Sequence, residues 1–441
     1  NTGQCRAVAC PVLNFRLGAA QGRHGAVSGR PQKRLQWDGR NPYRGLETFQ
    51  EADAEFFFGR ERLVDELVDR LAEARFVCVA GPSGSGKSSL VQAGLLYALK
   101  QGRIAKSEHW LYATTSPSTE PLEELARAVA RAGKTPAAAE YIRKHAAQDA
   151  TALCAQIETL LSHDRQQRFV LYIDQFEELF TQTRTESERT AFLAQLTTAA
   201  ENTDCRTIVI VSIRSDFLSQ CSAYPALREL INRQFLLVGE MQLEELEQAI
   251  VQPALAVGAG VEPELIDKIA AEMEGEPGAL PLMEFALRDL FEAETAKKQT
   301  GDAVRLTLDS YTRRGGIRKA LRRHADRVFK TLTPEQQALA RSLFTFLVEV
   351  GVGAQPTRRT ATVEALQHLG QPQAVDAVLQ ALADARLLTT SSPGNGDAGT
   401  VTVAHERLLS SWPWLEKLID ENREAIYLQN IVARDAAEWA K

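Results

Sequence analysis

Residues 78–94 read CVAGPSGSGKSSLVQAG, an apolar segment that runs through a glycine- and serine-rich turn into a helical pattern. Residues 81–88 fit the pattern G-x-x-x-x-G-K-[ST], and they lie between a strand pattern and a helix pattern, as this motif requires. Glycines let the backbone turn its N–H groups inward and approach phosphates closely, and the N-terminus of the following helix adds partial positive charge. The stretch therefore predicts a loop that binds the phosphates of a nucleotide, with a plain flexible turn as the alternative.

The side chains of this loop are expected to contact both phosphates and a metal ion. Lys87 carries a mobile positive charge that suits the β- and γ-phosphates, and the Ser88 hydroxyl can ligate Mg²⁺. The residues predicted to bind the nucleotide here are Gly81, Ser83, Gly84, Ser85, Gly86, Lys87, Ser88 and Ser89.

A second acidic motif, RFVLYIDQFEELF, occupies residues 168–180. Asp174 directly follows an apolar strand pattern, where its carboxylate can join Ser88 in holding Mg²⁺. Glu177 and Glu178 come one turn later, and either can act as the general base that polarises a water molecule. We expect Glu177 in that role, although spacing does not separate the two. A cluster of acids at a helix start is the alternative interpretation.

The stretch RTIVIVSIRSDFL, residues 206–218, ends its apolar run at Arg214. A cation at the carboxyl end of a core strand lies on the edge of an α/β sheet where ligands bind. Arg214 is therefore a candidate sensor of the γ-phosphate, and a salt bridge to Asp174 or Asp216 is the alternative.

Strand patterns alternate with helical ones through the first half of the chain, which predicts an α/β fold with a parallel sheet covered on both faces. From residue 241 to 330 the pattern is helical without strands. Residues 331–441 are helical too, except for a hairpin-like stretch at 386–405. Residues 1–40 are rich in arginine and nearly free of acids, which is typical of a tail or linker. The strand patterns lie at 76–80, 110–113, 169–173, 207–213 and 234–238.

Composition narrows the function classes. The chain has 441 residues with 44% hydrophobic and 24% charged residues, which is typical of a multidomain globular protein. The net charge of −6 argues against a protein that coats nucleic acid. No apolar run approaches the ~18 residues of a membrane span, so no membrane partner is expected.

The six cysteines lack metal-site spacing and are expected to be free thiols in the cytoplasm. The chain starts at Asn1 and stops inside a helical stretch, so we expect a piece of a longer protein.

Several separated motifs resemble those of STAND-class signalling NTPases, and in particular the bacterial group called novel STAND NTPase 1, with NACHT and NB-ARC proteins as more distant relatives. The resemblance runs from residue 41 to the C-terminus. Its motifs are NPYRGLETF with FFFGRERLVDEL, GPSGSGKSSL, LYIDQFEELF, VSIRSDF, GEPGALPLMEFAL and VTVAHERLLSSWPWL.

This resemblance implies a fold and a domain order. The expected architecture is a P-loop NTPase with a five-stranded parallel sheet of order 5-1-4-3-2, a helical lid and a winged-helix domain. The implied boundaries are a tail at 1–40, the NTPase core at 41–240, the lid at 241–312, and the winged-helix domain with the start of a C-terminal helix at 313–441.

The resemblance also implies roles for five more residues. Phe58, Gly59 and Arg60 fall in the stretch that lies against the adenine in the family, and Pro281 falls where a proline packs on the base. His405 falls where related switches place a histidine that reaches the phosphates in the resting state. From the residues alone, Pro281 is an ordinary proline at a helix start, and His405 is a structural histidine.

By this resemblance the protein is an ATP/ADP-dependent signalling switch that uses Mg²⁺, hydrolyses ATP slowly and forms homo-oligomers that activate an effector. No repeat of the WD40 or TPR type follows the winged-helix segment, so the sensor array usual in the family is expected to be missing from this chain.

Three other functions fit parts of the sequence: an AAA+-like ATPase motor, a module that keeps ADP as a structural ligand, and a winged-helix DNA-binding regulator. From Thr333 onward there are nine basic and thirteen acidic residues, which disfavours nucleic acid as a partner. The strongly basic stretch at 313–330 is the exception, and we expect it to be a solvated connecting helix.

Overall fold

The computed structural model divides the chain into residues 1–34 and 35–441. It describes residues 35–439, with gaps at 83, 119, 162–163, 182, 184, 275–277, 351–355, 386, 392–398 and 405–407. Residues 1–34 therefore lie outside the described part, and the fold below is that of the second unit.

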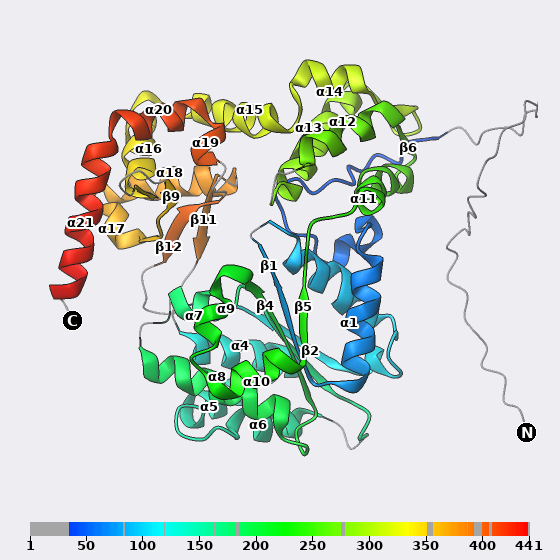
Figure 1. Cartoon of the computed structure of the whole chain (residues 1–441), viewed down its shortest axis with the longest axis vertical. Helices are drawn as coiled ribbons and strands as arrows, with labels where there is room; N and C mark the ends of the chain where they lie inside the picture. Colours follow the sequence, from blue (N-terminus) through cyan, green and yellow to red (C-terminus); the bar gives the residue numbers. More distant parts are fainter. Residues whose placement is uncertain are drawn as a thin grey trace, which may run out of the picture. The chain divides into compact units, whose positions relative to one another are not determined.

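A five-stranded parallel sheet forms the centre of the first half of this unit (Figure 1). Its order is β2-β3-β4-β1-β5, which is the predicted order 5-1-4-3-2 counted from the other edge, so that prediction is confirmed. The strands are β1 (Phe76–Gly81), β2 (Leu111–Thr115), β3 (Phe169–Ile173), β4 (Thr207–Arg214) and β5 (Phe235–Leu237).

The register of this sheet aligns the strand ends that carry the predicted site. Gly81 pairs with Arg214, and Ile173 pairs with both Thr115 and Val211. All these strands point the same way, so the loop after β1, the turn after β3 and the end of β4 meet at one edge.

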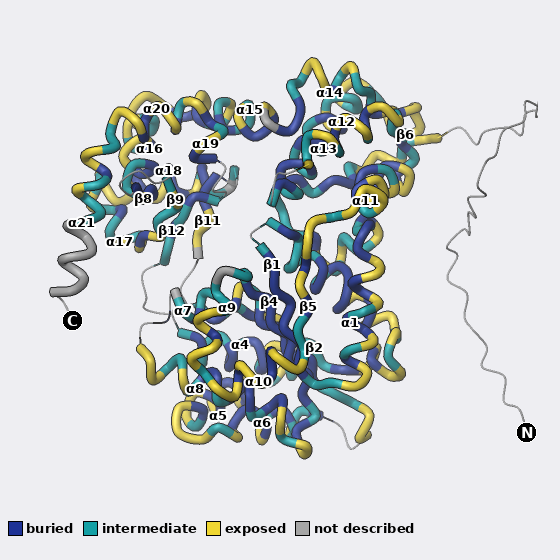
Figure 2. Tube along the Cα trace, in the orientation of Figure 1, coloured by how far each residue is buried: buried dark blue, intermediate teal, exposed yellow. Residues whose placement is uncertain are grey.

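Helices cover both faces of the sheet, which explains why its strands are continuously apolar (Figure 2). Alternate residues of β1 belong to different cores: Phe76 and Cys78 face one set of helices, and Val77 and Val79 face the other. The first set is α4 (Pro121–Gly133), α5 (Pro136–His145), α6 (Ala152–Leu160), α8 (Glu186–Glu201), α9 (Leu218–Cys221) and α10 (Pro225–Arg233). The second is α1 (Glu61–Glu73) and the helical segment after the loop, formed by α2 (Lys87–Ser89), η2 (Leu90–Leu96) and α3 (Tyr97–Lys100).

The region after the sheet is mainly helical, as expected, but the prediction that it lacks strands was wrong. Two short strands, β6 (Ala259–Val261) and β7 (Val304–Leu306), pair in parallel. Strands of three residues are too short to show an alternating pattern, so no pattern in the sequence indicated them. The helices are α11 (Leu243–Ala256), α12 (Pro263–Met273), α13 (Leu280–Thr295), α14 (Leu308–Arg314) and α15 (Gly316–Thr331).

The chain before α1 packs against this helical region. Residues 35–40 fall inside the tail expected from the sequence, yet Trp37 exchanges backbone hydrogen bonds with Gly301 and Asp302. The 3-10 helix η1 (Glu51–Phe56) follows, and Tyr43, Phe49 and Phe56 are buried in the same core as α11 and α13.

The last region contains the predicted hairpin. Strands β11 (Leu388–Ser391) and β12 (Thr400–Val403) pair antiparallel, and β10 (Ala361–Thr362) extends them to three strands. The side chain of Trp412 is fully buried at the centre of this region. The other elements are α16 (Pro334–Phe346), β8 (Val348–Glu349), β9 (Thr357–Arg358), α17 (Val363–Gln367), α18 (Pro372–Asp384), α19 (Leu408–Ser411), α20 (Pro413–Glu421) and α21 (Arg423–Trp439). Of the helices that the structure describes, none has the length and apolar character to cross a bilayer.

Candidate functional site

The loop between β1 and α2 has the backbone that phosphate binding requires. Gly84 and Gly86 have φ angles of 75° and 86°, a region that favours glycine. A Cβ atom at Gly84 would also lie 2.6 Å from the carbonyl oxygen of Gly278. The Lys87 ammonium donates hydrogen bonds to the carbonyl oxygens of Gly81 (3.0 Å) and Pro82 (2.9 Å), so it is held over the loop.

Ser88 and Asp174 meet where the sequence predicted a metal site. The Ser88 hydroxyl donates to Asp174 Oδ1 at 2.8 Å, and the Ser212 hydroxyl donates to the same oxygen at 2.5 Å. Gln175, next in the chain, has a φ of 48°, a strained conformation of the kind found at functional sites.

These two oxygen ligands fit Mg²⁺, which is usually held by one or two carboxylates together with substrate phosphates and water. Among the described residues, no three His, Cys, Asp or Glu side chains gather closely enough to hold a metal ion alone. A metal ion at Ser88 and Asp174 therefore needs oxygen ligands from a bound phosphate and water.

Glu177 and Glu178 lie in different surroundings. Glu177 Oε2 accepts a hydrogen bond from the Arg214 backbone N–H at 3.2 Å. Burial raises its pKa, and backbone N–H groups and the positive charges of Lys87 and Arg214 oppose that rise. Glu178 instead accepts hydrogen bonds from Ser116 and Ser118 after β2. Burial, followed by the neighbouring Glu177, raises the pKa of Glu178 to about 7. Of the two acids, Glu177 is thus the one that interacts with the positive charge of Lys87 in the phosphate loop.

Arg214 ends β4 beside these acids. Its guanidinium lies 5.5 Å from the centre of the Phe217 ring, and its backbone is paired with Gly81 at the start of the loop. The candidate sensor is therefore at the same sheet edge as the loop.

Arg60 joins the loop to its surroundings. Its side chain is only 4% exposed, and it donates to the carbonyl oxygens of Gly239 (2.8 Å) and Ser85 (3.5 Å). It also forms an ion pair with Glu245 at 3.3 Å. This guanidinium therefore connects the start of α1, the phosphate loop, the chain after β5 and α11.

A pocket of about 290 Å³ opens between the loop, the chain before α1 and α13. From the loop it is lined by Gly84 to Ser89, and from α13 by Leu280, Pro281, Met283 and Glu284. Its remaining lining is Gly45, Leu46, Glu47, Thr48, Phe49, Phe56, Phe57, Phe58, Arg60, Gln175, Met241, Ala249 and Ala404.

The pocket brings together most of the predicted ligand-binding residues. Of that set, Phe58, Arg60, Pro281 and the loop residues from Gly84 to Ser89 line it. Gly59 instead lies against α11, close to the backbone of Glu245. Ser83 and His405 lie outside the described residues, although Ala404, which precedes His405, is in the lining.

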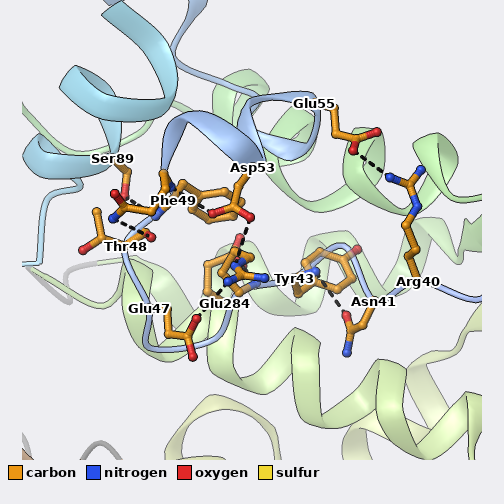
Figure 3. Close-up of polar contacts among 12 residues, drawn as sticks. Arg40, Asn41, Tyr43, Glu47, Thr48, Phe49, Asp53, Glu55, Ser89 and Glu284 are labelled. Atoms are coloured by element: carbon orange, nitrogen blue, oxygen red, sulfur yellow. Dashed lines mark hydrogen bonds and ion pairs between the residues drawn. The ribbon is translucent and has the colours of Figure 1, made fainter. Parts of the chain in front are cut away.

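Sequence reasoning missed the contribution of residues 45–49 and of Glu284. The Ser89 hydroxyl accepts a hydrogen bond from the Phe49 backbone N–H at 3.2 Å, so the end of the loop motif is tied to this segment (Figure 3). One signal was present in the sequence. Glu284 follows Pro281 by three residues, and residues so spaced share one face of a helix.

Three arginines of the basic stretch 313–330 share one carboxylate. Asp289 of α13 forms ion pairs with Arg323 (2.8 Å), Arg314 (3.4 Å) and Arg327 (3.7 Å). These arginines thus connect α13 to α14 and α15, in agreement with a connecting role.

A glycine-rich loop between a buried strand and a helix, with an aspartate from the end of a second parallel strand against its serine, defines the P-loop class, and the fold is that of a P-loop NTPase. The sequence matches the model of the novel STAND NTPase 1 family over residues 42–441. The protein therefore belongs to this family of nucleoside triphosphatases.

A search of curated protein sequences gave no significant match. Among solved structures, the Aeropyrum pernix ORC1 protein in complex with DNA is similar, with 15% identity and a TM-score of 0.46 over 83% of this chain and 93% of that one. The ORC2 protein of the same organism has 16% identity and a TM-score of 0.46, over 85% and 95% of the two chains. A Walker-type ATPase of Pyrococcus abyssi has 14% identity and a TM-score of 0.38, over 82% and 97%.

Replacing Gly59 with alanine is expected to destabilise the protein by about 2 kcal/mol, since it combines backbone strain with a clash. The φ of Gly59 is 85°, and a Cβ atom would lie 2.2 Å from the Glu245 carbonyl oxygen. Thermal unfolding measures the effect. Gly239→Ala is the matched control, because nothing lies within 4 Å of a Cβ there. Equal melting temperatures for the two variants would contradict the prediction.

Proposed function

We propose that this protein is an ATP/ADP-dependent switch of bacterial signalling that acts in the cytoplasm. It binds Mg–ATP, hydrolyses it slowly and couples the nucleotide state to homo-oligomerisation and the activation of an effector. The observation that carries this proposal is the composition of the pocket. A nucleotide held by the phosphate loop would also contact Pro281 of α13 and the residues near Ala404.

The proposed moving parts are the domains expected from the sequence: the NTPase core at 41–240, a helical lid at 241–312 and a winged-helix domain at 313–441. The order α16, β10, α17, α18, β11 and β12 supports the last of these, because a helix, a strand, two helices and a hairpin are typical of a winged-helix domain.

For hydrolysis, Lys87 would turn from the Gly81 and Pro82 carbonyls to the β- and γ-phosphates. Ser88 and Asp174 would hold Mg²⁺, which neutralises the charge that develops on the transferred group. Glu177 would accept a proton from the attacking water, and Arg214 would contact the γ-phosphate. Glu178, turned toward Ser116 and Ser118, would support this edge without taking the proton.

For switching, a ligand shifts a conformational equilibrium only through contacts that differ between the two states. The γ-phosphate distinguishes ATP from ADP, so it must change the contacts of the lid or of the winged-helix domain. We assign the lock to His405, by its resemblance to the histidine of related switches, and to the packing of Pro281 on the base. Sensor repeats of the WD40 or TPR type and an effector would be the further partners.

Two other functions predict different observations. A motor of the AAA+ type is expected to turn over at about 10 per second, like an ordinary enzyme, whereas a switch is expected to be far slower. A DNA-binding regulator is expected to bind DNA through the basic side chains at 313–330 with a steep dependence on salt, whereas a switch would use Arg314, Arg323 and Arg327 to connect helices through Asp289.

Lys87→Ala is expected to weaken the binding of ATP and ADP by about 100-fold, because it removes the charge that faces the phosphates. Isothermal titration calorimetry in the presence of Mg²⁺ measures this. The control is Lys417→Ala, since that lysine is 77% exposed and pairs with Glu421 on the same helix. Unchanged affinity in Lys87→Ala would remove the basis of the proposal.

Glu177→Gln is expected to slow ATP hydrolysis by about 100-fold or more while leaving ATP affinity nearly unchanged, because an amide cannot accept the proton. Single-turnover hydrolysis of radiolabelled ATP measures the rate. Glu178→Gln is the paired variant and should reduce the rate far less. The reverse order of effects would assign the base to Glu178.

His405→Ala is expected to oligomerise with ADP bound, because the lock of the resting state is lost. The wild-type protein should need ATP for the same assembly. Light scattering coupled to size-exclusion chromatography gives the mass of each species. If the variant and the wild-type protein have the same mass with either nucleotide, His405 is not the lock.

A further inference from the structure

Glu284 is an acid inside the pocket that the proposed hydrolysis does not use. It lies on α13 one turn after Pro281, and both residues line the pocket. Figure 3 shows it next to the segment that carries Tyr43, Glu47 and Thr48. Its Oε2 atom accepts a hydrogen bond from the Arg44 backbone N–H at 3.3 Å. Among the described residues, no other hydrogen bond to this carboxyl group is found, so its second oxygen is available to a ligand.

The nearest cation does not neutralise this carboxyl group. The Arg44 guanidinium pairs with Glu47 at 2.9 Å and with Asp53 at 3.4 Å. Arg288, one turn further along α13, donates to the Arg44 carbonyl oxygen and pairs with Glu292. The Tyr43 hydroxyl, also close by, donates to the Ile250 carbonyl oxygen at 2.6 Å.

The surroundings of this carboxyl group favour its protonated form at neutral pH. Burial raises the pKa of Glu284 to about 8, and the Arg44 backbone N–H and the Arg44 charge offset this rise only in part. A protonated carboxyl group offers one donor, its O–H, beside one acceptor, its C=O.

The base of a bound nucleotide would lie in the same part of the pocket. The phosphates belong at Lys87, and away from the loop the lining is mainly apolar, with Leu46, Phe49, Met241 and Met283. Apolar and aromatic side chains with a few placed polar groups are typical of sites that hold a flat ring. Glu284 supplies such a polar group on this side.

We propose that the Glu284 carboxyl group reads the edge of the base that carries the 6-substituent and selects adenine over guanine. This inference rests on the proposed function, because it requires the nucleotide to lie in this pocket. On this edge adenine presents the N6 amino donor beside the N7 acceptor. The C=O of the protonated carboxyl group can accept from N6, and its O–H can donate to N7. Guanine presents the O6 acceptor at the same place, and two acceptors would face each other.

The same chemistry makes ATP binding depend on pH. When pH rises through about 8, Glu284 loses its proton and can no longer donate to the ring nitrogen. The affinity for ATP should then fall, while guanine stays disfavoured, because the O6 and N7 acceptors of its edge would face a carboxylate that offers acceptors only. Tyr43 and Arg44 interact with Glu284, Glu47 and Arg288 lie beside Arg44, and the arginines stay charged through this range.

The test is the equilibrium binding of ATP and GTP with Mg²⁺ at about pH 7 and about pH 9.5, to either side of the shifted pKa. For the wild-type protein we expect about tenfold preference for ATP at the lower pH and about tenfold weaker ATP binding at the higher, the loss of roughly one hydrogen bond. Glu284→Gln keeps a donor and an acceptor without titrating, so it should bind ATP equally well at both pH values. Glu284→Leu should lose the preference at both. Glu292→Gln, on the same helix but outside the pocket, should behave as the wild-type protein does.

The possible outcomes separate this inference from the proposed function. If Glu284→Leu binds ATP and GTP with unchanged ratio, or if Glu284→Gln keeps the pH dependence of the wild-type protein, Glu284 does not read the base. Nucleotide binding that depends on Lys87 would still stand in that case. If the wild-type protein binds neither nucleotide, the proposed function fails and this inference fails with it. Melting temperatures of the variants confirm that each is folded.

Discussion

The parallel register of β1, β3 and β4 is the constraint on which the candidate site depends. It places the phosphate loop, Asp174 and Arg214 at one edge of the sheet. The strands are buried on both faces, so a shift of register would have to move two cores at once. The contact between Ser88 and Asp174 exists because two strands separated in sequence by nearly ninety residues end at the same edge of the sheet. This edge is thus held in place by the sheet itself.

The opposite wall of the pocket is built differently. It comes from the chain before α1 and from α13, and it meets the loop through individual contacts such as Arg60 with Ser85 and Ser89 with Phe49. This wall is held by side-chain packing and single polar contacts, including the burial of Phe49 and Phe56 in one core with Ala93, whereas the sheet is held by continuous backbone pairing. A pocket whose two walls are held by different kinds of contact suits a protein whose ligand is meant to change the position of its parts.

The sequence predicted the part of the site on the sheet edge well and the wall formed by the chain before α1 and by α13 poorly, for a physical reason. The phosphate loop and the position of Asp174 follow from local patterns and from the rule that parallel strand ends share an edge, and the strand order followed from the resemblance to STAND-class NTPases. The role of Arg60 depends on contacts with Gly239 and Glu245, about 180 residues further along the chain, and that of Glu284 on the Arg44 backbone, 240 residues away. No periodicity or motif records such contacts. The strands β6 and β7 were missed because three residues carry too little pattern.

The central claim is that the nucleotide bound at the phosphate loop, ATP or ADP, determines the oligomeric state of the protein. The most direct test is the mass of the freshly purified protein, measured with its bound nucleotide identified after denaturation, before and after exchange into a non-hydrolysable ATP analogue. The account predicts a monomer that carries ADP and a larger assembly with the analogue. The same mass with both nucleotides, each present in full occupancy, would contradict it.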